Sequence, residues 1–338
     1  MTTVLISSAG RRVELLRAFR QAVADDVDGG GRGRVIAADC SWYSSAFHDA
    51  DEAVLVPRID DPTFVDQMVR LCEEERVDLV IPTLDPELPV YATARDRFAE
   101  VGTTVAISAP EVVAIAGDKA STHEWLVANG FPSVRQGSLA DSLENRDHWR
   151  LPLVVKPRFG SASIGVTFVH TLDQLRHVAT AMPDAVVQSV ARGHEHTIDV
   201  LASRDGSCRA AVPRRRLEVR AGEVSKAMTV RSPALEELAA KLCAALPGAY
   251  GALNVQVFMA EDGAEAEMAV IEVNARFGGG YPLALAAGAD FPRALVQDVR
   301  GQPPTAAVDG WRDALMMLRY DAAVFVDHAE GGDARRVN

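Results

Sequence analysis

The sequence lacks the features that mark several special classes of protein. Its 338 residues include four cysteines, and these lie far apart without the paired spacing of a zinc site or a disulfide framework. No apolar run approaches the roughly 18 residues that span a bilayer. The N-terminus also lacks the basic start and apolar core of a signal peptide. We therefore predict a cytoplasmic protein that has no membrane partner.

Positive charge is also scarce. The chain has 35 Lys and Arg against 47 Asp and Glu, a formal net charge of −12. Binding of nucleic-acid phosphates needs a broad excess of basic residues, so we predict no nucleic-acid partner. One stretch is locally basic, "RRRLEVRAGEVSKAMTVR" at 214–231. It is suited to an acidic small molecule, because guanidinium groups pair bidentately with carboxylates. The alternative interpretation is a solvated basic face.

The first 110 residues alternate apolar strands with helices of amphipathic period. Such repetition predicts a doubly wound parallel sheet. The predicted strands are 3–8, 34–39, 77–83 and 103–108, and the predicted helices are 13–23, 62–76 and 87–101. A glycine-rich turn or connection is expected at 27–34.

From residue 110 the pattern changes to two short helices followed by strands with hairpin-like spacing. We predict that this half is α+β and largely antiparallel. The helices are 110–117, 118–130, 172–182 and 232–246, and the strands are 151–157, 165–170, 185–190, 194–203, 208–219, 223–230, 251–260 and 267–277. The last two strands are joined by "EDGAE", which carries the Asp-Gly signal of a hairpin turn.

The stretch "LVVKPRFGSASIGVTFV" at 153–169 places a lysine at the end of an apolar strand. A buried ammonium is costly unless an anion or several acceptors hold it. The loop 159–165 after Lys156 contains two glycines and three small or hydroxylated residues, whose backbone N–H groups would be free to close over a phosphate. The alternative is a plain hairpin loop.

The stretch "IEVNAR" places Glu272, Asn274 and Arg276 on one face of a strand, because side chains two positions apart point the same way. Gln256 of the preceding strand would lie opposite Glu272 if the register allows. Oxygen ligands of these types suit Mg²⁺. The three glycines that follow Arg276 would let backbone approach a ligand. A solvated polar face at a sheet edge is the alternative.

Weaker candidates surround these motifs. Lys119 lies in the first turn of a predicted helix, where it is either a ligand contact or an exposed lysine. Asp85 and Glu87 follow a parallel strand, at the edge where open α/β sheets bind ligands, or they only cap the next helix. Glu195 and Asp199 share a strand face and would meet ribose hydroxyls or basic groups.

Taken in order, eight motifs resemble the ATP-grasp superfamily, most closely its carbamoyl-phosphate-synthase-like proteins. They are "SSAGRRVEL", "LDPELP", "GDKAS", "VVKPRFGSASIGV", "GHEHTIDV", "VPRRRLEVRAGEVSK", "LNVQ" and "EVNARFGGGYP". The resemblance covers nearly the whole chain and implies an ATP-grasp fold. Its expected parts are a Rossmann-like pre-ATP-grasp domain at 1–110, a small α+β lobe with the phosphate loop at 111–190, and a C-terminal α+β lobe with the metal and substrate site at 191–327. The polar, small residues 328–338 are expected to form a frayed tail.

The resemblance also implies residue roles. ATP would be held by Lys119, Lys156, Ser161, Ser163, Ile164, Gly165, Gln188, Ser189, Val190 and Glu195. Of these, Gln188, Ser189 and Val190 would border adenine as the hinge strand between the lobes, and Glu195 would hold the ribose. Mg²⁺ would be bound by Gln256, Glu272 and Asn274, and the catalytic residues would be Lys156, Arg214 and Arg276. Substrate contacts would come from Asp85, Glu87, Arg214, Arg216, Lys226, Arg231 and Gly279. Gln256 replaces the carboxylate of many relatives, and the chain is far shorter than the synthase itself.

Family chemistry implies that a carboxylate attacks the γ-phosphate of ATP and that an amine, less often a thiol, displaces phosphate from the acyl phosphate. We therefore predict a carboxylate–amine ligase for small, amino-acid-like substrates, with a homodimer as a common assembly of such proteins. The alternatives are an ATP-dependent small-molecule kinase, a carbamate-forming enzyme and a non-catalytic nucleotide sensor.

Overall fold

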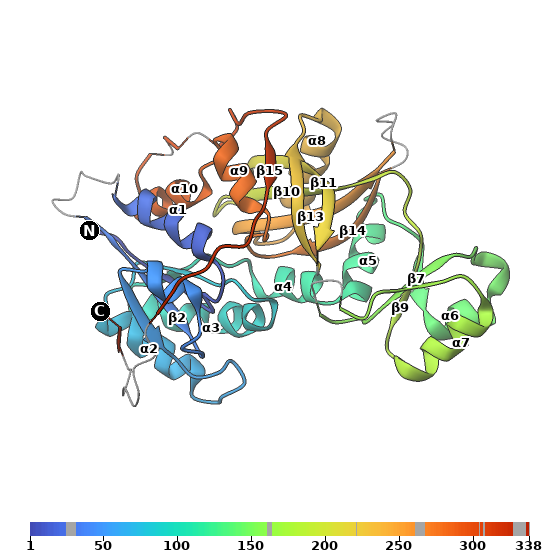
Figure 1. The fold of residues 1–338 in the computed structure, drawn as a ribbon, viewed down its shortest axis with the longest axis horizontal. Coiled ribbons are helices and arrows are strands. Elements are labelled where there is room, and N and C mark those ends of the chain that lie inside the picture. Colours follow the sequence, from blue (N-terminus) through green and yellow to red (C-terminus); the bar gives the residue numbers. More distant parts are fainter. Residues whose placement is uncertain are drawn as a thin grey trace.

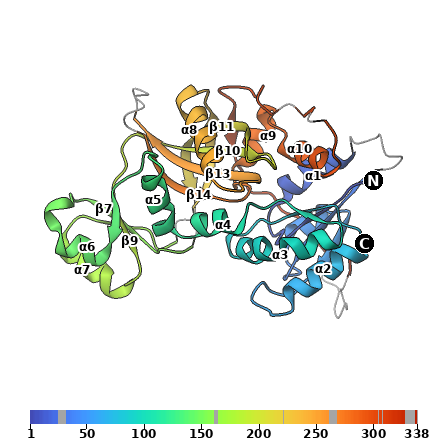
Figure 2. The same cartoon turned by 180° about the vertical axis from the view of Figure 1, so that it is seen from behind.

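The computed structural model describes residues 1–24, 32–160, 164–220, 222–260, 268–303, 305–306 and 308–326, and the backbone of 336–337. Its strands form three sheets that follow one another along an elongated molecule (Figure 1). The N-terminal sheet lies at one end, a six-stranded sheet in the middle and a four-stranded sheet at the far end. Figure 2 shows the same order from behind. The turn predicted at 261–265 and most of the glycine-rich stretch predicted at 27–34 lie outside the described residues.

The N-terminal sheet is parallel in the order β3-β2-β1-β4-β5, as predicted for a doubly wound domain. Its strands are β1 (Thr3–Ile6), β2 (Arg34–Asp39), β3 (Glu52–Leu55), β4 (Leu79–Ile81) and β5 (Thr104–Val105). Its helices are α1 (Val13–Ala24), η2 (Ser45–Asp49), α2 (Phe64–Glu74), η3 (Asp85–Glu87) and α3 (Leu88–Glu100). The central strands are apolar on both faces because helices cover both faces. Strand β3 was not predicted, since its four residues are too few to show a period.

The middle sheet is antiparallel in the order β14-β13-β10-β11-β12-β15. Its strands are β10 (His194–Ala202), β11 (Cys208–Arg220), β12 (Glu223–Thr229), β13 (Gly251–Met259), β14 (Ala269–Asn274) and β15 (Met316–Leu318). Helices α4 (Pro110–Gly117), α5 (Lys119–Ala128) and α8 (Pro233–Ala245) pack on its apolar face. Helices α9 (Tyr281–Ala287) and α10 (Phe291–Val299) contact α1 and so join this half of the chain to the N-terminal domain.

The four-stranded sheet, in the order β6-β9-β7-β8, is also antiparallel and has its own small core around Trp149. Its elements are β6 (Gln136–Ser138), α6 (Leu139–Glu144), η4 (Arg146–His148), β7 (Leu153–Lys156), β8 (Thr167–Val169), α7 (Leu172–Ala181) and β9 (Val186–Ser189). The predicted α+β, antiparallel character of the second half is therefore confirmed. A separate core lets this lobe stand apart from the rest of the molecule.

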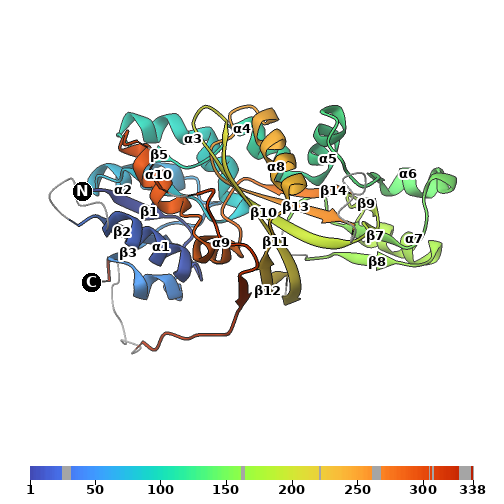
Figure 3. The same ribbon diagram turned by 90° about the horizontal axis from the view of Figure 1, so that it is seen from above.

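After β15 the chain runs back along the molecule toward the N-terminal sheet, as Figure 3 shows. The tail predicted to fray, residues 328–338, lies mostly outside the described residues. Within it, β16 (Arg336–Val337) pairs antiparallel with β3. Among the described residues, no helix is both long and apolar enough to cross a membrane.

Candidate active site

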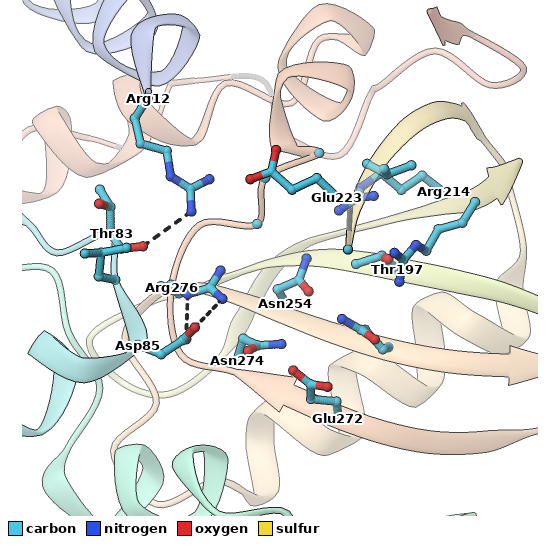
Figure 4. A pocket seen from close by; sticks show the side chains of 18 residues that line it. Arg12, Thr83, Asp85, Thr197, Arg214, Glu223, Asn254, Glu272, Asn274 and Arg276 are labelled. Carbon is cyan, nitrogen blue, oxygen red and sulfur yellow. Dashed lines mark hydrogen bonds and ion pairs between the residues drawn. The ribbon is translucent and has the colours of Figure 1, made fainter. Parts of the chain in front are cut away.

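The polar face of the middle sheet forms one wall of a pocket of about 210 Å³ (Figure 4). The opposite wall comes from the N-terminal domain, through Arg12 before α1 and Thr83 to Asp85 after β4. The glycine run after β14 lines the space between the two walls. The pocket therefore lies where the carboxyl end of a parallel strand meets the second half of the chain, which is the usual ligand position in open α/β sheets.

The strand register brings the predicted metal ligands together. Gln256 lies opposite Glu272, as predicted, and the neighbouring pair is Asn254 opposite Asn274. Antiparallel pairing places such opposite side chains about 4.5–5.5 Å apart at Cβ. Within the described part of the chain, the side chains of Gln256, Glu272 and Asn274 have no hydrogen-bond or ion-pair partner, and all three line the pocket. They are oxygen donors that the protein itself leaves free.

Lys156 ends β7 and is 6% exposed, as the apolar strand around it predicted. Burial is the main cause that lowers its pKa to about 8, and Lys119 lowers it further. The carboxylates of Glu272 and Glu195 act in the opposite direction. No hydrogen-bond or ion-pair partner for Nζ exists among the described residues. A buried, unpartnered ammonium is costly, so this position favours an external anion.

Lys119 is the first residue of α5, whose N-cap Asp118 accepts a hydrogen bond from the backbone of Ala120. Its Nζ donates to the carbonyl of Gly160 at 2.7 Å, so it reaches the predicted phosphate loop. Ser161 and Ser163 of that loop lie outside the described residues. Ile164 is exposed at the loop exit. Gly165 has φ +75, and a Cβ there would lie 2.8 Å from Pro157, so the turn requires glycine.

The residues predicted to border adenine end the small lobe. The side chain of Gln188 is buried and donates from Nε2 to Oε1 of Gln136 at 2.6 Å. Ser189 is the last residue of β9, and the exposed Val190 begins the connection to β10. This segment joins the two lobes, which is the position that the hinge interpretation requires.

Three arginines of the pocket are paired with carboxylates. Nε of Arg214 donates to Asp199 at 2.8 Å, with side chains 3% and 1% exposed. Arg216 forms a close ion pair with Glu195, so the predicted ribose residue is engaged by an arginine in this state. Arg276 binds Asp85 bidentately, at 2.6 Å from Nε and 2.7 Å from Nη2 (Figure 4). That last pair links the middle sheet to the N-terminal domain.

The glycine run packs against these side chains. A Cβ on Gly280 would lie 2.4 Å from Nη1 of Arg214, and one on Gly278 would lie 2.4 Å from Nδ2 of Asn254. Asn254 in turn donates to Asp199 at 3.0 Å. The glycines were predicted to let the backbone approach a ligand. At Gly278 and Gly280 the backbone instead closely approaches the protein's own side chains. Gly279 lines the pocket between them.

The structure does not place three predicted substrate contacts in the pocket. Glu87 is completely buried, where it accepts hydrogen bonds from Ser7, Ser8 and the backbone of Thr83 and Leu84. Burial raises the pKa of this carboxyl group against those hydrogen bonds. The carboxylate therefore organises the loop after β4. Sequence position placed it at the right edge of the sheet but did not reveal its orientation.

Lys226 and Arg231 also lie away from the pocket. Lys226 is half exposed and pairs with Glu218 at 2.7 Å. Arg231 lies over the ring of Trp311, 3.5 Å from its centroid, and donates to the carbonyl oxygens of Asp309 and Trp311. The basic residues of 214–231 therefore do not share one site. Arg214 and Arg216 face the pocket, whereas these two residues do not.

The pocket also contains residues that were not predicted individually, namely Arg12, Thr83, Leu84, Thr197, Gly222, Glu223, Val224, Asn254, Gly278 and Gly280. Arg12 and Glu223 lie within motifs that carry the family resemblance, "SSAGRR" and "RAGE". The signal was present, but only the folded chain shows which arginine of the first motif points inward. Arg12 is part of the pocket, whereas Arg11 is 85% exposed in its side chain.

Comparison with known families divides the chain near residue 110, where the sequence pattern changes. Residues 4–106 match the family model described as "PylC-like, N-terminal domain", and residues 116–280 match the one described as "ATP-grasp domain". A D-alanine–D-alanine ligase of Rhodococcus opacus (strain B4) is 32% identical over 181 residues, 48% of this chain and 48% of that protein. The chain spans about half the length of the curated relative it matches there.

Solved structures resemble nearly the whole chain. The biotin carboxylase domain of Hydrogenobacter thermophilus 2-oxoglutarate carboxylase, solved with MgADP and bicarbonate, gives a TM-score of 0.73 at 18% identity, over 93% of this chain and 73% of that one. An L-amino acid ligase of Bacillus licheniformis gives 0.68 at 18% identity, over 89% and 74%. These likenesses show the fold, a parallel N-terminal domain followed by two antiparallel lobes. The family-model match identifies an ATP-grasp domain at residues 116–280 of this chain.

Proposed function

We propose that the protein is an ATP- and Mg²⁺-dependent ligase that activates a carboxylate as an acyl phosphate and joins it to an amine. The observation that carries the proposal is Lys156, a buried ammonium without a described partner, beside Glu272. ATP phosphates would supply the missing anion. The ATP-grasp domain and the ligases among the chain's relatives support this chemistry.

The residues at the sheet edge fit Mg²⁺. Gln256, Glu272 and Asn274 offer one carboxylate and two amide oxygens, and none has another partner among the described residues. Mg²⁺ is often held by one or two carboxylates and completes its shell with water and substrate phosphates. Among the described residues, no group of three or more His, Cys, Asp and Glu could hold a metal ion, so the proposed site depends on the two amide oxygens beside its one carboxylate. When bound, the ion would neutralise charge that develops on the phosphates.

The chain's own residues would position the reactants. Lys156 and Lys119 would hold ATP phosphates, with residues 159–165 closing over them. The segment from Gln188 to Val190 would border adenine, and Glu195 would exchange its bond to Arg216 for the ribose. The two N–H donors of Arg276 that remain beside its bonds to Asp85 and the Phe277 carbonyl would meet the transferred phosphoryl group. Such electrostatic positioning supplies most of the catalysis in phosphoryl transfer.

The reaction has two steps. A carboxylate oxygen of the acid attacks the γ-phosphorus, the bond to the β-phosphate oxygen breaks, and ADP leaves. The amine nitrogen then attacks the acyl carbon, inorganic phosphate leaves, and the nitrogen gives up a proton. Arg214 would contact the acid while its Nε stays bonded to Asp199. No side-chain nucleophile is required. We keep the domain bounds 1–110, 111–190 and 191–327, a cytoplasmic location and a homodimer as parts of this proposal.

The test is ADP and phosphate release from MgATP across amino acids and small carboxylates, offered singly and in pairs. We expect turnover only with a particular acid and amine together, and we expect its loss in Glu272→Ala. ADP formed with one acid alone would instead indicate a kinase or a carbamate-forming enzyme. MgATP binding without turnover on any pair would indicate a nucleotide sensor.

A further inference from the structure

Arg12 differs from the other arginines of the pocket in its charge balance. Arg214, Arg216 and Arg276 each have a carboxylate partner. Arg12 has no ion pair within the described residues, and the one hydrogen bond of its side chain there is to the carbonyl of Thr83 at 3.4 Å (Figure 4). A half-buried guanidinium with so weak a partner leaves positive charge that the protein does not neutralise.

Arg12 places this charge on the wall of the pocket that the N-terminal domain forms. Its Nη1 lies 3.6 Å from the place that a Cβ on Gly279 would occupy, so glycine leaves the approach open. Burial, and then the like charge of Arg276, lower the pKa of Arg12 to about 10, which leaves it charged at neutral pH. Glu223 and Asp85 act in the opposite direction, but Glu223 is shared with Arg11 at 3.4 Å and Arg319 at 3.3 Å, and Asp85 is bound bidentately by Arg276.

One carboxylate does not require both guanidiniums. Arg276 has five N–H donors, of which three are used by Asp85 and by the carbonyl of Phe277. The two that remain serve the reacting end of the acid, where its carboxylate receives the phosphoryl group. The charge of Arg12 is additional and lies on the opposite wall of the pocket, so it matches a second anion on the same molecule.

We propose that Arg12 binds a second anionic group, a carboxylate or a phosphate, on the acid that the enzyme activates. The substrate acid is therefore at least a dianion. The identity of the first, reacting carboxylate rests on the proposed function. The contact of Arg12 with the second group depends only on the pocket.

Binding of substrate analogues tests the proposal without turnover. Dissociation constants would be measured by calorimetry in the presence of MgADP for malonate, succinate, glutarate, adipate, phosphonoacetate and 3-phosphonopropionate. Each is compared with the monocarboxylate of the same chain length. We expect at least one dianion to bind the wild type about 10-fold or more tightly than its monocarboxylate, because a charge-assisted pair is formed in a partly dry site. Comparing the dicarboxylates with the phosphonates shows whether the second group is a carboxylate or resembles a phosphate.

Variants then locate the effect. Arg12→Gln should remove the preference for the dianion, and Arg12→Lys should restore part of it. Arg17→Gln is the matched control, because Arg17 lies on α1, is mostly exposed and pairs with Asp49 outside the pocket. The control should keep the preference, and melting temperatures would confirm that each variant folds.

The proposal is overturned if the wild type binds dianions no better than monocarboxylates, if it binds neither, or if Arg12→Gln retains the preference. If Arg12→Gln does not fold, the comparison of dianion with monocarboxylate binding by the wild type can still overturn the proposal. Turnover of monocarboxylates with an amine, unaffected by Arg12→Gln, would reject the second-anion site while the ligase stands. A dianion preference that depends on Arg12, without ADP release on any acid–amine pair, would support the site and reject the ligase.

Discussion

Two sets of residues at the site satisfy their charges in opposite ways. Lys156 and the pocket residues Gln256, Glu272 and Asn274 have no side-chain hydrogen-bond or ion-pair partner among the described residues. Arg214, by contrast, is held by Asp199 in an almost fully buried ion pair. Charges that the protein pairs internally hold the fold, whereas charges left open can be satisfied by a ligand.

Whether a buried charge has a partner within the protein separates structural from ligand-binding roles among similar residue types. A buried pair is strongly destabilised when one partner is removed, because the other charge is left uncompensated. A buried charge without a partner destabilises the free protein instead, and a bound anion reverses this. Substituting one charged residue at a time therefore tests whether the paired charges stabilise the fold and the unpaired ones bind a ligand.

The largest effect is expected from Asp199→Asn. It leaves the buried Arg214 without a counter-charge, so we expect the free energy of unfolding to fall by about 3–5 kcal/mol in urea titration. Asp173→Asn is the matched control, because its ion pair with Arg176 lies at the surface. A loss for Asp199→Asn no larger than that of the control would show that the buried pair does not hold the sheet.

Lys156→Met should act in opposite directions on stability and binding. A pKa near 8 instead of 10.5 means that the charge costs the folded, ligand-free protein about 3 kcal/mol at neutral pH, so the variant should be more stable by up to that amount. Its affinity for MgATP should fall at least about 100-fold, because a buried charge pair with phosphate is lost. Unfolding titrations and calorimetry measure the two effects. Unchanged MgATP affinity would place the nucleotide elsewhere.

The same lysine predicts a pH dependence of nucleotide binding. Phosphates favour the charged ammonium, so bound MgATP should raise the pKa of Lys156 above about 8. Between the free and bound pKa values the complex holds more protons, so affinity should fall as pH rises above about 8. Calorimetry at that pH in buffers of different ionisation enthalpy should show proton uptake. Lys156→Arg, which stays charged, should show none, and equal uptake in both proteins would assign the proton to another group.

Without nucleotide, the dependence of stability on pH has the opposite sign. The pKa of Lys156 is lowered on folding, so between about 8 and 10.5 the unfolded chain binds more protons than the folded one. The contribution of Lys156 to the free energy of unfolding should therefore rise with pH in this window. The difference between wild type and Lys156→Met in urea titrations at several pH values isolates it.

The smallest effect is expected from Lys226→Gln. This lysine shares the basic stretch with Arg214 but pairs at the surface with Glu218. Stability should change by no more than about 0.5 kcal/mol, and MgATP affinity should not change. A marked rise in the KM of the acid substrate would return Lys226 to the pocket in a closed state of the enzyme.

Local patterns predicted most elements, and tertiary contacts explain the failures. The apolar strands at 34–39 and 251–260 and the helix at 110–117 follow from periodicity and proline position. The elements that were missed are short, and pairing or packing with their neighbours decides them; they include strands β3, β6 and β15 and helices α6, α9 and α10.

The sequence by itself determined which chemistry the protein carries: a lysine in an apolar strand, oxygen donors at alternating positions, and arginines near glycines. Their alternation and burial depend on residues close in the chain. Only the tertiary structure decided how these charges are shared. Asp85 meets Arg276 across 191 positions, and Arg12 faces the same pocket without a carboxylate. Pairing between distant residues depends on how the domains pack, and no local pattern encodes that.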